Sequence, residues 1–365
     1  MQFRLQAMPD DGPVRLPDPL GFGRVFTRRT LEQRYETSGG WGEAVIGPAG
    51  RIALDAAANI FHSGQGIFEG TKAYLRPDGR VQLFRPDANA ARFNASAVRL
   101  AMPTLDPTDF VDAIDTIVSL ERDWVPPGEG ASLYIRPFLI GTEATLEVRA
   151  SRAFLFSILL SPAGPYFASG FQPVGIRVEE HHVRAAPGGT GAAKTIGNYA
   201  ASLFATEAAR VDGYQQVLWL DAVERRFVEE AGSMNIAFVY GGSEIVTPAL
   251  SGSILPGITR DSVLRMAPDL GHPVREALLD ASEVLRDIAS GRISEVFCMG
   301  TAAVVVPVGR IGRHGKDTVV GAGEAGPVTR KLYAALTDIQ YGRTADPYGW
   351  TRIVDPEAAL SRCYA

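Results

Sequence analysis

The chain has 365 residues, 46% of them hydrophobic and 21% charged, which is the composition of a globular protein with room for two domains. The net charge is −5 and no basic run stands out, so a nucleic-acid partner is not expected. No apolar run reaches membrane-spanning length and the N-terminus lacks a signal pattern, so we expect a cytoplasmic protein. The two cysteines, Cys298 and Cys363, form no close pair, and no metal site is indicated.

The N-terminal part predicts both strands and helices. Residues 1–30 are rich in Pro and Gly and predict an irregular arm. Pro77-Asp78-Gly79 is a turn signal between two apolar runs and predicts a β-hairpin. In chain order we expect strands over 41–47, 51–56, 70–76 and 80–85, helices over 87–102 and 107–123, and strands over 131–140 and 152–161.

A domain boundary is predicted where Pro, Gly and Ser gather and the periodicity ends. We expect a small N-terminal α/β domain over 1–163, a linker over 164–172 and a larger C-terminal domain over 173–365. Asn198 is the expected N-cap of a helix that ends near Val211. Further elements are expected over 173–183, 215–221, 226–231, 235–241 and 243–249 (strands), 256–267 and 280–291 (helices), and 295–311 (strand, turn, strand). These elements follow no steady βαβ rhythm, which favours an α+β fold.

One lysine has an unusual setting. The sequence contains only four lysines, Lys72, Lys194, Lys316 and Lys331, although Lys and Arg together number 36. Arginine can replace lysine as a surface cation but cannot form a Schiff base. Lys194 lies in the nearly uncharged, glycine-rich stretch GGTGAAKTIGNY, where the backbone can approach a planar ligand closely. Lys194 is therefore either a candidate nucleophile or a lysine in a surface loop.

The same stretch nearly fits a phosphate-binding loop. Gly188 to Thr195 would satisfy G-x-x-x-x-G-K-[ST], but Ala193 stands where the second glycine is required. The preceding HHVRAA is not the apolar strand that this motif needs. A nucleotide-binding protein is thus a remote alternative.

The chain resembles the branched-chain-amino-acid aminotransferases, a family of fold-type IV enzymes that depend on pyridoxal 5'-phosphate (PLP). The resemblance spans 64–308, and its pieces occur in the family's order: GQGIFEGTKAY, LFRPDANAARFNASAVRLAMP, LYIRPFLIGTEATLEV, GTGAAKTIGNYAASL, VEEAGSMNIAFVY, ILPGITRDSVL and MGTAAVVVPV. It implies an α+β, two-domain fold like that of D-amino-acid aminotransferase, with the site between a small N-terminal and a larger C-terminal domain.

The resemblance assigns the residues around the cofactor ring. Lys194 matches the lysine that binds the PLP aldehyde and then moves the substrate's Cα proton. Glu230 matches the carboxylate at the pyridine nitrogen, although Glu229 beside it shows that the residue type alone is ambiguous. Tyr199 matches the tyrosine that hydrogen-bonds the ring hydroxyl, and Ser233 and Asn235 match positions near the ring.

Phosphate contacts are implied at four positions. Arg92 matches the family's phosphate arginine, whose guanidinium suits a phosphate. Ile258 and Thr259 open a helix whose first N–H groups attract anions, and Thr301 belongs to a Gly-Thr-Ala turn. Thr259 could instead be a simple helix cap.

The resemblance also implies substrates and a partner. Tyr134, Thr301 and Ala302 match residues that bind the α-carboxylate, Arg136 matches a residue that accepts the glutamate side chain, and Phe68 and Val148 match walls of the alkyl pocket. The implied reaction moves an amino group reversibly between Leu, Ile or Val and 2-oxoglutarate, giving branched 2-oxo acids and L-glutamate. The segment around Val148 reaches the partner's site in this family, which implies an obligate homodimer.

Three departures from the family concern specificity and redox behaviour. Ser63 replaces a common tyrosine, Glu147 replaces a common glycine, and Ala303 to Val306 replace a CxxC pair of mammalian members. A thiol switch is therefore not expected at that turn, and Cys298 is expected to be a buried strand residue. D-amino-acid aminotransferases, R-selective amine transaminases, aminodeoxychorismate lyases and a non-catalytic homologue are the alternatives within the fold.

Overall fold

The computed structural model describes residues 1–9, 12–165 and 171–365, and the chain divides into two compact units. The first unit contains Met1–Ala168, Ala193–Ile196 and Asp338–Ala365, and the second contains Ser169–Ala192 and Gly197–Thr337. The expected linker, 164–172, lies in part outside the described residues. The sequence-based boundaries placed 338–365 in the C-terminal domain, whereas the structure groups this segment with the first unit.

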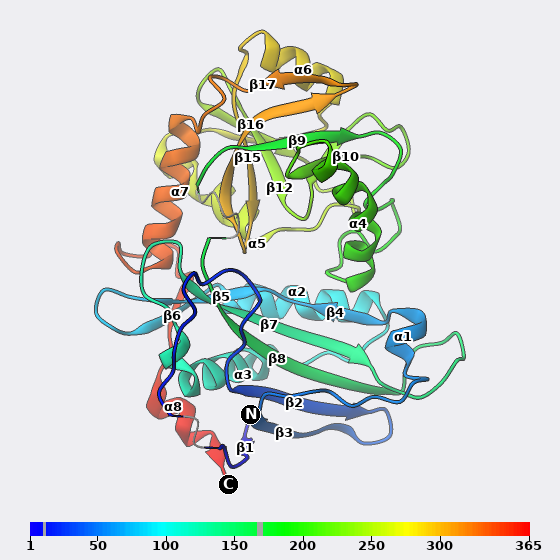
Figure 1. The fold of residues 1–365 in the computed structure, drawn as a ribbon, viewed down its shortest axis with the longest axis vertical. Helices are drawn as coiled ribbons and strands as arrows, with labels where there is room; N and C mark the ends of the chain where they lie inside the picture. The colour runs from blue at the N-terminus through cyan, green and yellow to red at the C-terminus, as the bar shows by residue number, and fades with distance from the viewer. Residues whose placement is uncertain (10–11, 166–170) are drawn as a thin grey trace. The chain divides into compact units, whose positions relative to one another are not determined.

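The first unit is built on a sheet that has ten strands among the described residues (Figure 1). Its elements are β1 (Phe3–Leu5), β2 (Arg29–Glu36), β3 (Gly40–Pro48), α1 (Asn59–Ser63), β4 (Gly66–Phe68), β5 (Thr71–Leu75), β6 (Val81–Phe84), α2 (Pro86–Arg99), α3 (Pro107–Leu120), β7 (Ser132–Gly141), β8 (Ala153–Ala163), β18 (Thr351–Ile353), α8 (Pro356–Ser361) and β19 (Cys363–Tyr364). The order is β18-β6-β5-β7-β8-β2-β3-β1-β19, and β4 pairs with β7. Because β18 pairs with β6, the C-terminal segment completes this sheet.

The predicted hairpin and both predicted helices of the first unit are present. β5 and β6 pair antiparallel, and Gly79 in the turn between them has a φ of +79°, which glycine adopts without strain. Each helix begins with proline, Pro86 in α2 and Pro107 in α3, where the missing N–H costs nothing. Asp106 caps α3 by accepting a hydrogen bond from the Thr108 N–H at 2.7 Å.

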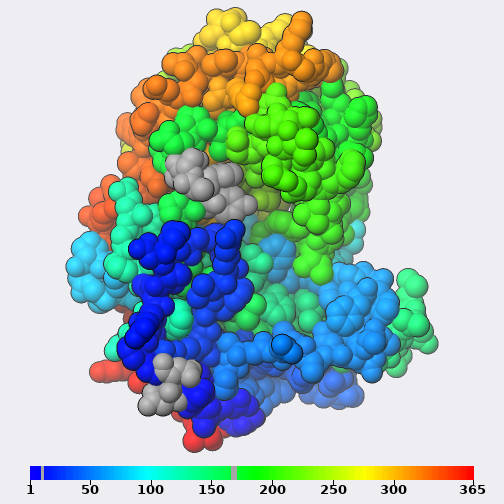
Figure 2. All heavy atoms as spheres, in the orientation of Figure 1, coloured from blue at the N-terminus to red at the C-terminus, as the bar shows by residue number. Residues whose placement is uncertain are grey.

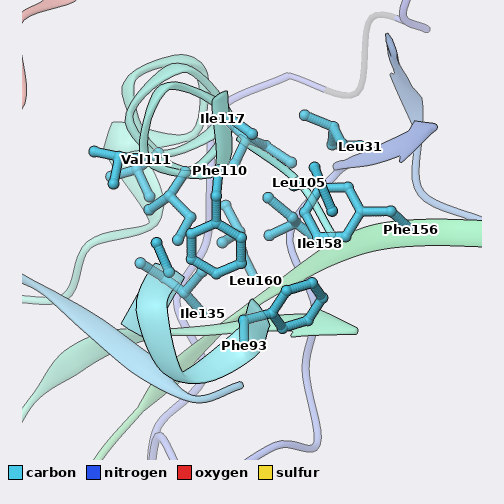
Figure 3. Packing of buried hydrophobic residues seen from close by; sticks show 14 of the residues in the cluster. Leu31, Phe93, Leu105, Phe110, Val111, Ile117, Ile135, Phe156, Ile158 and Leu160 are labelled. Atoms are coloured by element: carbon cyan, nitrogen blue, oxygen red, sulfur yellow. The ribbon is translucent and has the colours of Figure 1, made fainter. Parts of the chain in front are cut away.

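The core of the first unit lies between these two helices and the sheet. Figure 3 shows Phe93 of α2 and Phe110 of α3 packed toward Phe156 of β8. The ring centroids of Phe93 and Phe110 are 5.0 Å apart, and all three rings are buried. This apolar layer fixes α2, which carries Arg92, against the sheet that carries Tyr134 and Arg136 on β7.

The second unit is built on a mixed sheet that has nine strands among the described residues. Its elements are β9 (Val174–Glu179), α4 (Ile196–Val211, beginning at the edge of the first unit), β10 (Gln216–Leu220), β11 (Val228–Ala231), β12 (Asn235–Tyr240), β13 (Glu244–Pro248), α5 (Ile258–Met266), β14 (Val274–Ala277), α6 (Ala281–Ala289), β15 (Ile293–Gly300), β16 (Val304–Arg313), β17 (Lys316–Val319) and α7 (Pro327–Gln340). The order is β11-β10-β9-β16-β15-β12-β13-β14, and β17 pairs with β16. Cys298 is fully buried in β15 as expected, and burial raises the pKa of its thiol to about 12.

Two local predictions were wrong. Residues 51–56 form no strand: the Asp55 carboxylate accepts a hydrogen bond from the Ala57 N–H at 2.8 Å, and this turn leads into α1. Asn198 is not an N-cap, because α4 begins two residues earlier, at Ile196. Asn198 instead exchanges two hydrogen bonds of 2.8 Å with Thr190 and ties the glycine-rich turn to the helix.

Across the described ranges, no helix combines the length and apolar character needed to cross a bilayer.

Candidate functional site

A buried ion pair joins α2 to the turn between β4 and β5. Arg92 donates from Nε to Glu69 Oε1 at 2.7 Å and from Nη2 to Oε2 at 2.9 Å, and Glu69 is fully buried. The Glu69 carboxylate also accepts from Asn89 Nδ2 at 2.7 Å and from the Gly70 N–H at 3.0 Å. Burial opposes the charged form of Glu69, but Arg92, with smaller contributions from Lys194 and Asn89, outweighs it and lowers the pKa of this carboxyl. The guanidinium of Arg92 therefore has a fixed orientation.

The main chain of Lys194 is held on both sides within the first unit. Its carbonyl accepts from the Phe68 N–H at 3.0 Å, and its own N–H donates to Ser96 Oγ at 2.9 Å. Thr195 adds a hydrogen bond from its hydroxyl to the Gly66 carbonyl at 2.9 Å. The Lys194 ammonium lies 4.8 Å from the centroid of the Phe68 ring. The lysine singled out in the sequence is therefore anchored to β4 and α2 rather than lying in a free surface loop.

Phe68 is also the platform for an arginine. The Arg136 guanidinium lies 4.5 Å from the Phe68 ring centroid, and its Nη2 donates to the Tyr134 hydroxyl at 3.0 Å. Gly70 leaves space for this hydroxyl, because a Cβ at residue 70 would lie 2.3 Å from it. The Nε of Arg136 is buried and has no hydrogen-bond acceptor among the described residues. The structure thus groups Phe68, Tyr134, Arg136 and Lys194 and leaves a buried donor without an acceptor beside them.

The other lysine of the first unit, Lys72, is buried. Lys72 lies in β5, where desolvation lowers the pKa of its amine to about 8. Lys72 pairs in register with Tyr134 of β7. This unit consequently holds two candidate amines, and only Lys194 was singled out from the sequence.

In the second unit, a tight hairpin places Glu230 beside Asn235. The turn Gly232-Ser233 joins β11 to β12, and Gly232 has a φ of +57°, as such turns require. Asn235 Nδ2 donates to Glu230 Oε1 at 3.3 Å and to the Leu255 carbonyl at 3.0 Å. Glu230 and Asn235 are both buried.

Glu230 lines a small cavity in the second unit together with Tyr199, Ser233 and Arg184. Arg184 Nε lies 2.5 Å from Glu230 Oε2, and their side chains are 8% and 3% exposed. Glu229 faces the opposite side of β11, where Ser253 Oγ donates to its carboxylate. Strand alternation therefore separates the two adjacent glutamates, and only Glu230 faces the cavity.

Two further backbone features lie near this hairpin. α5 begins at Ile258 with Gly257 as N-cap and no side-chain cap, so Thr259 is not the helix cap. A Cβ at residue 257 would lie 1.9 Å from Asn235 Oδ1, so the approach of this helix end requires glycine. The turn containing Thr301 and Ala302 follows β15, whose Met299 pairs with Asn235, and Val304 after it has a φ of +63°. A β-branched residue such as valine is strained when its φ is positive, and such strain is typical of functional turns.

One predicted residue lies elsewhere in the first unit. Val148 is in the loop between β7 and β8, which protrudes beside α1 (Figure 2). Its side chain is fully exposed. Two residues in the clusters above, Glu69 and Arg184, were not predicted. Glu69 lies within the motif GQGIFEGTKAY but was assigned no role, whereas Arg184 lies outside the matching pieces. Each is identified by a partner distant in sequence, Arg92 and Glu230.

Comparisons with known proteins agree with the motifs. Residues 66–311 match the family model described as amino-transferase class IV. The chain is 52% identical over 338 residues to branched-chain-amino-acid transaminase 1 of Bacillus subtilis strain 168, covering 92% of this chain and 95% of that protein. It is 50% identical to a probable branched-chain-amino-acid aminotransferase of Streptomyces coelicolor, covering 90% of this chain and 91% of that protein.

A solved structure gives the same result. The branched-chain amino acid aminotransferase of Escherichia coli is similar with a TM-score of 0.73 at 28% identity, covering 83% of this chain and 94% of that one. The expected α+β fold of fold-type IV is thereby confirmed. This chain belongs to the class IV amino-transferases and, among them, to the branched-chain-amino-acid aminotransferase family.

Proposed function

We propose that this protein is a PLP-dependent branched-chain-amino-acid transaminase. It transfers the amino group reversibly between Leu, Ile or Val and 2-oxoglutarate, giving branched 2-oxo acids and L-glutamate. The observation that carries the proposal is the group around Phe68, where Lys194 and Arg136 contact the same aromatic ring. An amine, an apolar wall and a guanidinium are what an amino acid with an alkyl or an acidic side chain requires.

The residues present fit the cofactor. Glu230 is a buried carboxylate that faces a cavity in the second unit, and Tyr199 lines the same cavity. When bound, PLP supplies an electron-accepting ring that stabilises negative charge at the substrate Cα. Lys194 would hold the aldehyde carbon and carry the Cα proton, Glu230 would hold the proton on the ring nitrogen, and Tyr199 would donate to the ring hydroxyl. Ser233 and Asn235 would support this side of the ring.

The phosphate would be bound by Arg92, Ile258, Thr259 and Thr301. The first N–H groups of a helix attract anions, and α5 offers Ile258 and Thr259 at its start. Glu69 fixes the orientation of the Arg92 guanidinium by accepting from its Nε and Nη2.

Arg92→Ala is expected to weaken PLP binding by about 10- to 100-fold, because a charge-assisted hydrogen bond contributes roughly 1.5–3 kcal/mol. Fluorescence titration of the apoenzyme with PLP measures the dissociation constant. Arg99→Ala is the matched control, since Arg99 is exposed and lies seven residues further along the same helix. An unchanged dissociation constant in Arg92→Ala would remove the phosphate role of this residue.

The substrate would be bound at two chemically different places. Tyr134 and the turn of Thr301 and Ala302 would hold the α-carboxylate. Arg136 would accept the acid of glutamate, since its buried Nε has no acceptor among the described residues. Phe68 would contact the alkyl group of Leu, Ile or Val, with Val148 as a further wall. Ser63, which replaces a tyrosine common in the family, lies in α1, where its hydroxyl donates to Asn59 Oδ1 at 2.8 Å.

We also propose a cytoplasmic homodimer. Leu146 and Val148 in the loop between β7 and β8 are 71% and 100% exposed, which is unfavourable for apolar side chains unless a partner covers them. Glu147 beside them pairs with Arg149 at 2.5 Å, so this charge has a local partner.

Val148→Asp is expected to weaken the dimer by about tenfold or more, because it would bury an unpaired carboxylate at the contact. Light scattering after size-exclusion chromatography, over a range of concentrations, measures the mass. Val319→Asp is the control, since Val319 is an exposed residue of β17. The dimer contact would have to lie elsewhere if both variants kept the wild-type mass at every concentration.

The function is tested by a visible spectrum and a substrate panel. The purified protein with PLP is expected to absorb in the visible range, to lose this band with leucine and to regain it with 2-oxoglutarate. D-alanine and aminodeoxychorismate are expected to leave the band unchanged. A response to either of these and not to leucine would favour a different class IV activity, and a colourless protein would favour a non-catalytic homologue.

A further inference from the structure

The carboxylate of Glu230 is fixed by two protein groups, one on each oxygen. Asn235 Nδ2 donates to Oε1 at 3.3 Å, and Arg184 Nε lies 2.5 Å from Oε2. Asn235 is the first residue of β12, whereas Arg184 lies in the stretch after β9. Rotation of the carboxylate would break at least one of these contacts.

Arg184 is itself anchored to the backbone. Its Nη2 donates to the Gly191 carbonyl at 3.2 Å and to the Ser253 carbonyl. These two carbonyl-bearing residues are packed together, since a Cβ at residue 191 would lie 2.1 Å from Ser253 O. Ser253 is held in turn by the hydrogen bond from its hydroxyl to Glu229. The guanidinium thus connects Glu230 to the glycine-rich turn that precedes Lys194 by three residues.

We propose that Arg184 is the positioning residue for Glu230, an inference that rests on the proposed function. A cation beside a buried carboxylate favours its charged form. When Glu230 shares a proton with the cofactor's ring nitrogen, Arg184 keeps that proton on the nitrogen instead of on the carboxyl group. A lysine at residue 184 would supply the charge but could not reproduce the planar fork that reaches both carbonyl oxygens and Glu230.

The test compares Arg184→Gln and Arg184→Lys with a matched arginine control. Arg177→Gln is the control, because Arg177 of β9 pairs with Asp212 and Glu179 and does not line the cavity. Each holoenzyme is reconstituted with PLP that carries ¹⁵N in the ring, and the ring-nitrogen resonance, kcat and KM for leucine, and the urea midpoint of the apoenzyme are measured.

Arg184→Gln is expected to move the ring-nitrogen resonance toward that of an unprotonated pyridine. Its kcat should fall by about 10- to 100-fold, as is typical when a group that orients a catalytic ligand is lost, with little change in KM. Arg184→Lys should keep the resonance close to the wild-type value while kcat falls by a smaller factor. Arg177→Gln should match the wild type in resonance and kcat.

Two results would overturn the proposal. One is a wild-type resonance and kcat in Arg184→Gln while Glu230→Gln changes both. The other is a fall in kcat and in the urea midpoint with an unmoved resonance, which would mean a purely structural role. If Arg184→Gln does not fold, Arg184→Lys decides: a reduced kcat with a wild-type urea midpoint supports the proposal, and a wild-type kcat, or a kcat and a urea midpoint that fall together, overturns it. Failure of the proposed function is a separate result, since the wild type would then not bind PLP or transaminate leucine.

Discussion

Lys194→Ala is expected to lower kcat for leucine and 2-oxoglutarate by about 10³-fold or more, because under the proposed function it removes both the amine that would bind the aldehyde and the base that would move the Cα proton. The fold should be retained. The contacts that hold this position, to the Phe68 N–H and to Ser96 Oγ, come from the main chain, and alanine keeps them.

The control for this variant is Lys316→Ala, because Lys316 is exposed in β17. Circular dichroism and the thermal midpoint should be close to the wild type in both variants, and only Lys194→Ala should lose turnover. Wild-type turnover in Lys194→Ala would refute the assignment of this lysine. It would also direct attention to Lys72, whose amine has a pKa of about 8 in the same unit.

Glu230→Gln is expected to lower kcat by about 10²- to 10³-fold, because a neutral amide cannot hold a proton on the ring nitrogen by charge. It should also destabilise the apoenzyme by about 3–5 kcal/mol, since the buried guanidinium of Arg184 loses its ionic partner. Turnover must therefore be measured per bound cofactor and well below the thermal midpoint.

Glu224→Gln is the matched control for that variant. Glu224 is about half exposed in the turn between β10 and β11. It does not line the cavity beside Glu230. Equal turnover per bound cofactor in Glu230→Gln and Glu224→Gln would contradict the role of Glu230 at the ring.

Helices and strands that are marked by neighbouring residues in the sequence, such as turn or capping residues, could be predicted. The β5–β6 hairpin was predicted because its turn has a characteristic sequence. The helix expected over 107–123 is present as α3, whose start is marked locally by Pro107 and an Asp cap. The segment 51–56 was wrongly expected to be a strand, because alternation alone does not show whether a partner strand exists. α7 was missed, although Val328, Leu332 and Leu336 recur at helical spacing.

The candidate site was predictable only in part, because some of its residues are identified only by contacts that form in the fold. Sequence motifs indicated Lys194 and Glu230, whereas the residue type alone could not separate Glu230 from Glu229. The structure separates them by strand alternation and by the Arg184 contact. Glu69 and Arg184 could not be predicted, because their partners are 23 and 46 residues away and become neighbours only in the fold.

Borohydride reduction of the holoenzyme followed by peptide mass mapping tests the central claim most directly, because it fixes the cofactor on the amine to which it is bound. The expected result is one pyridoxyl-modified peptide, containing Lys194, whose label is lost when leucine is added before reduction. A label on Lys72, or no labelled peptide from protein saturated with PLP, would contradict the account.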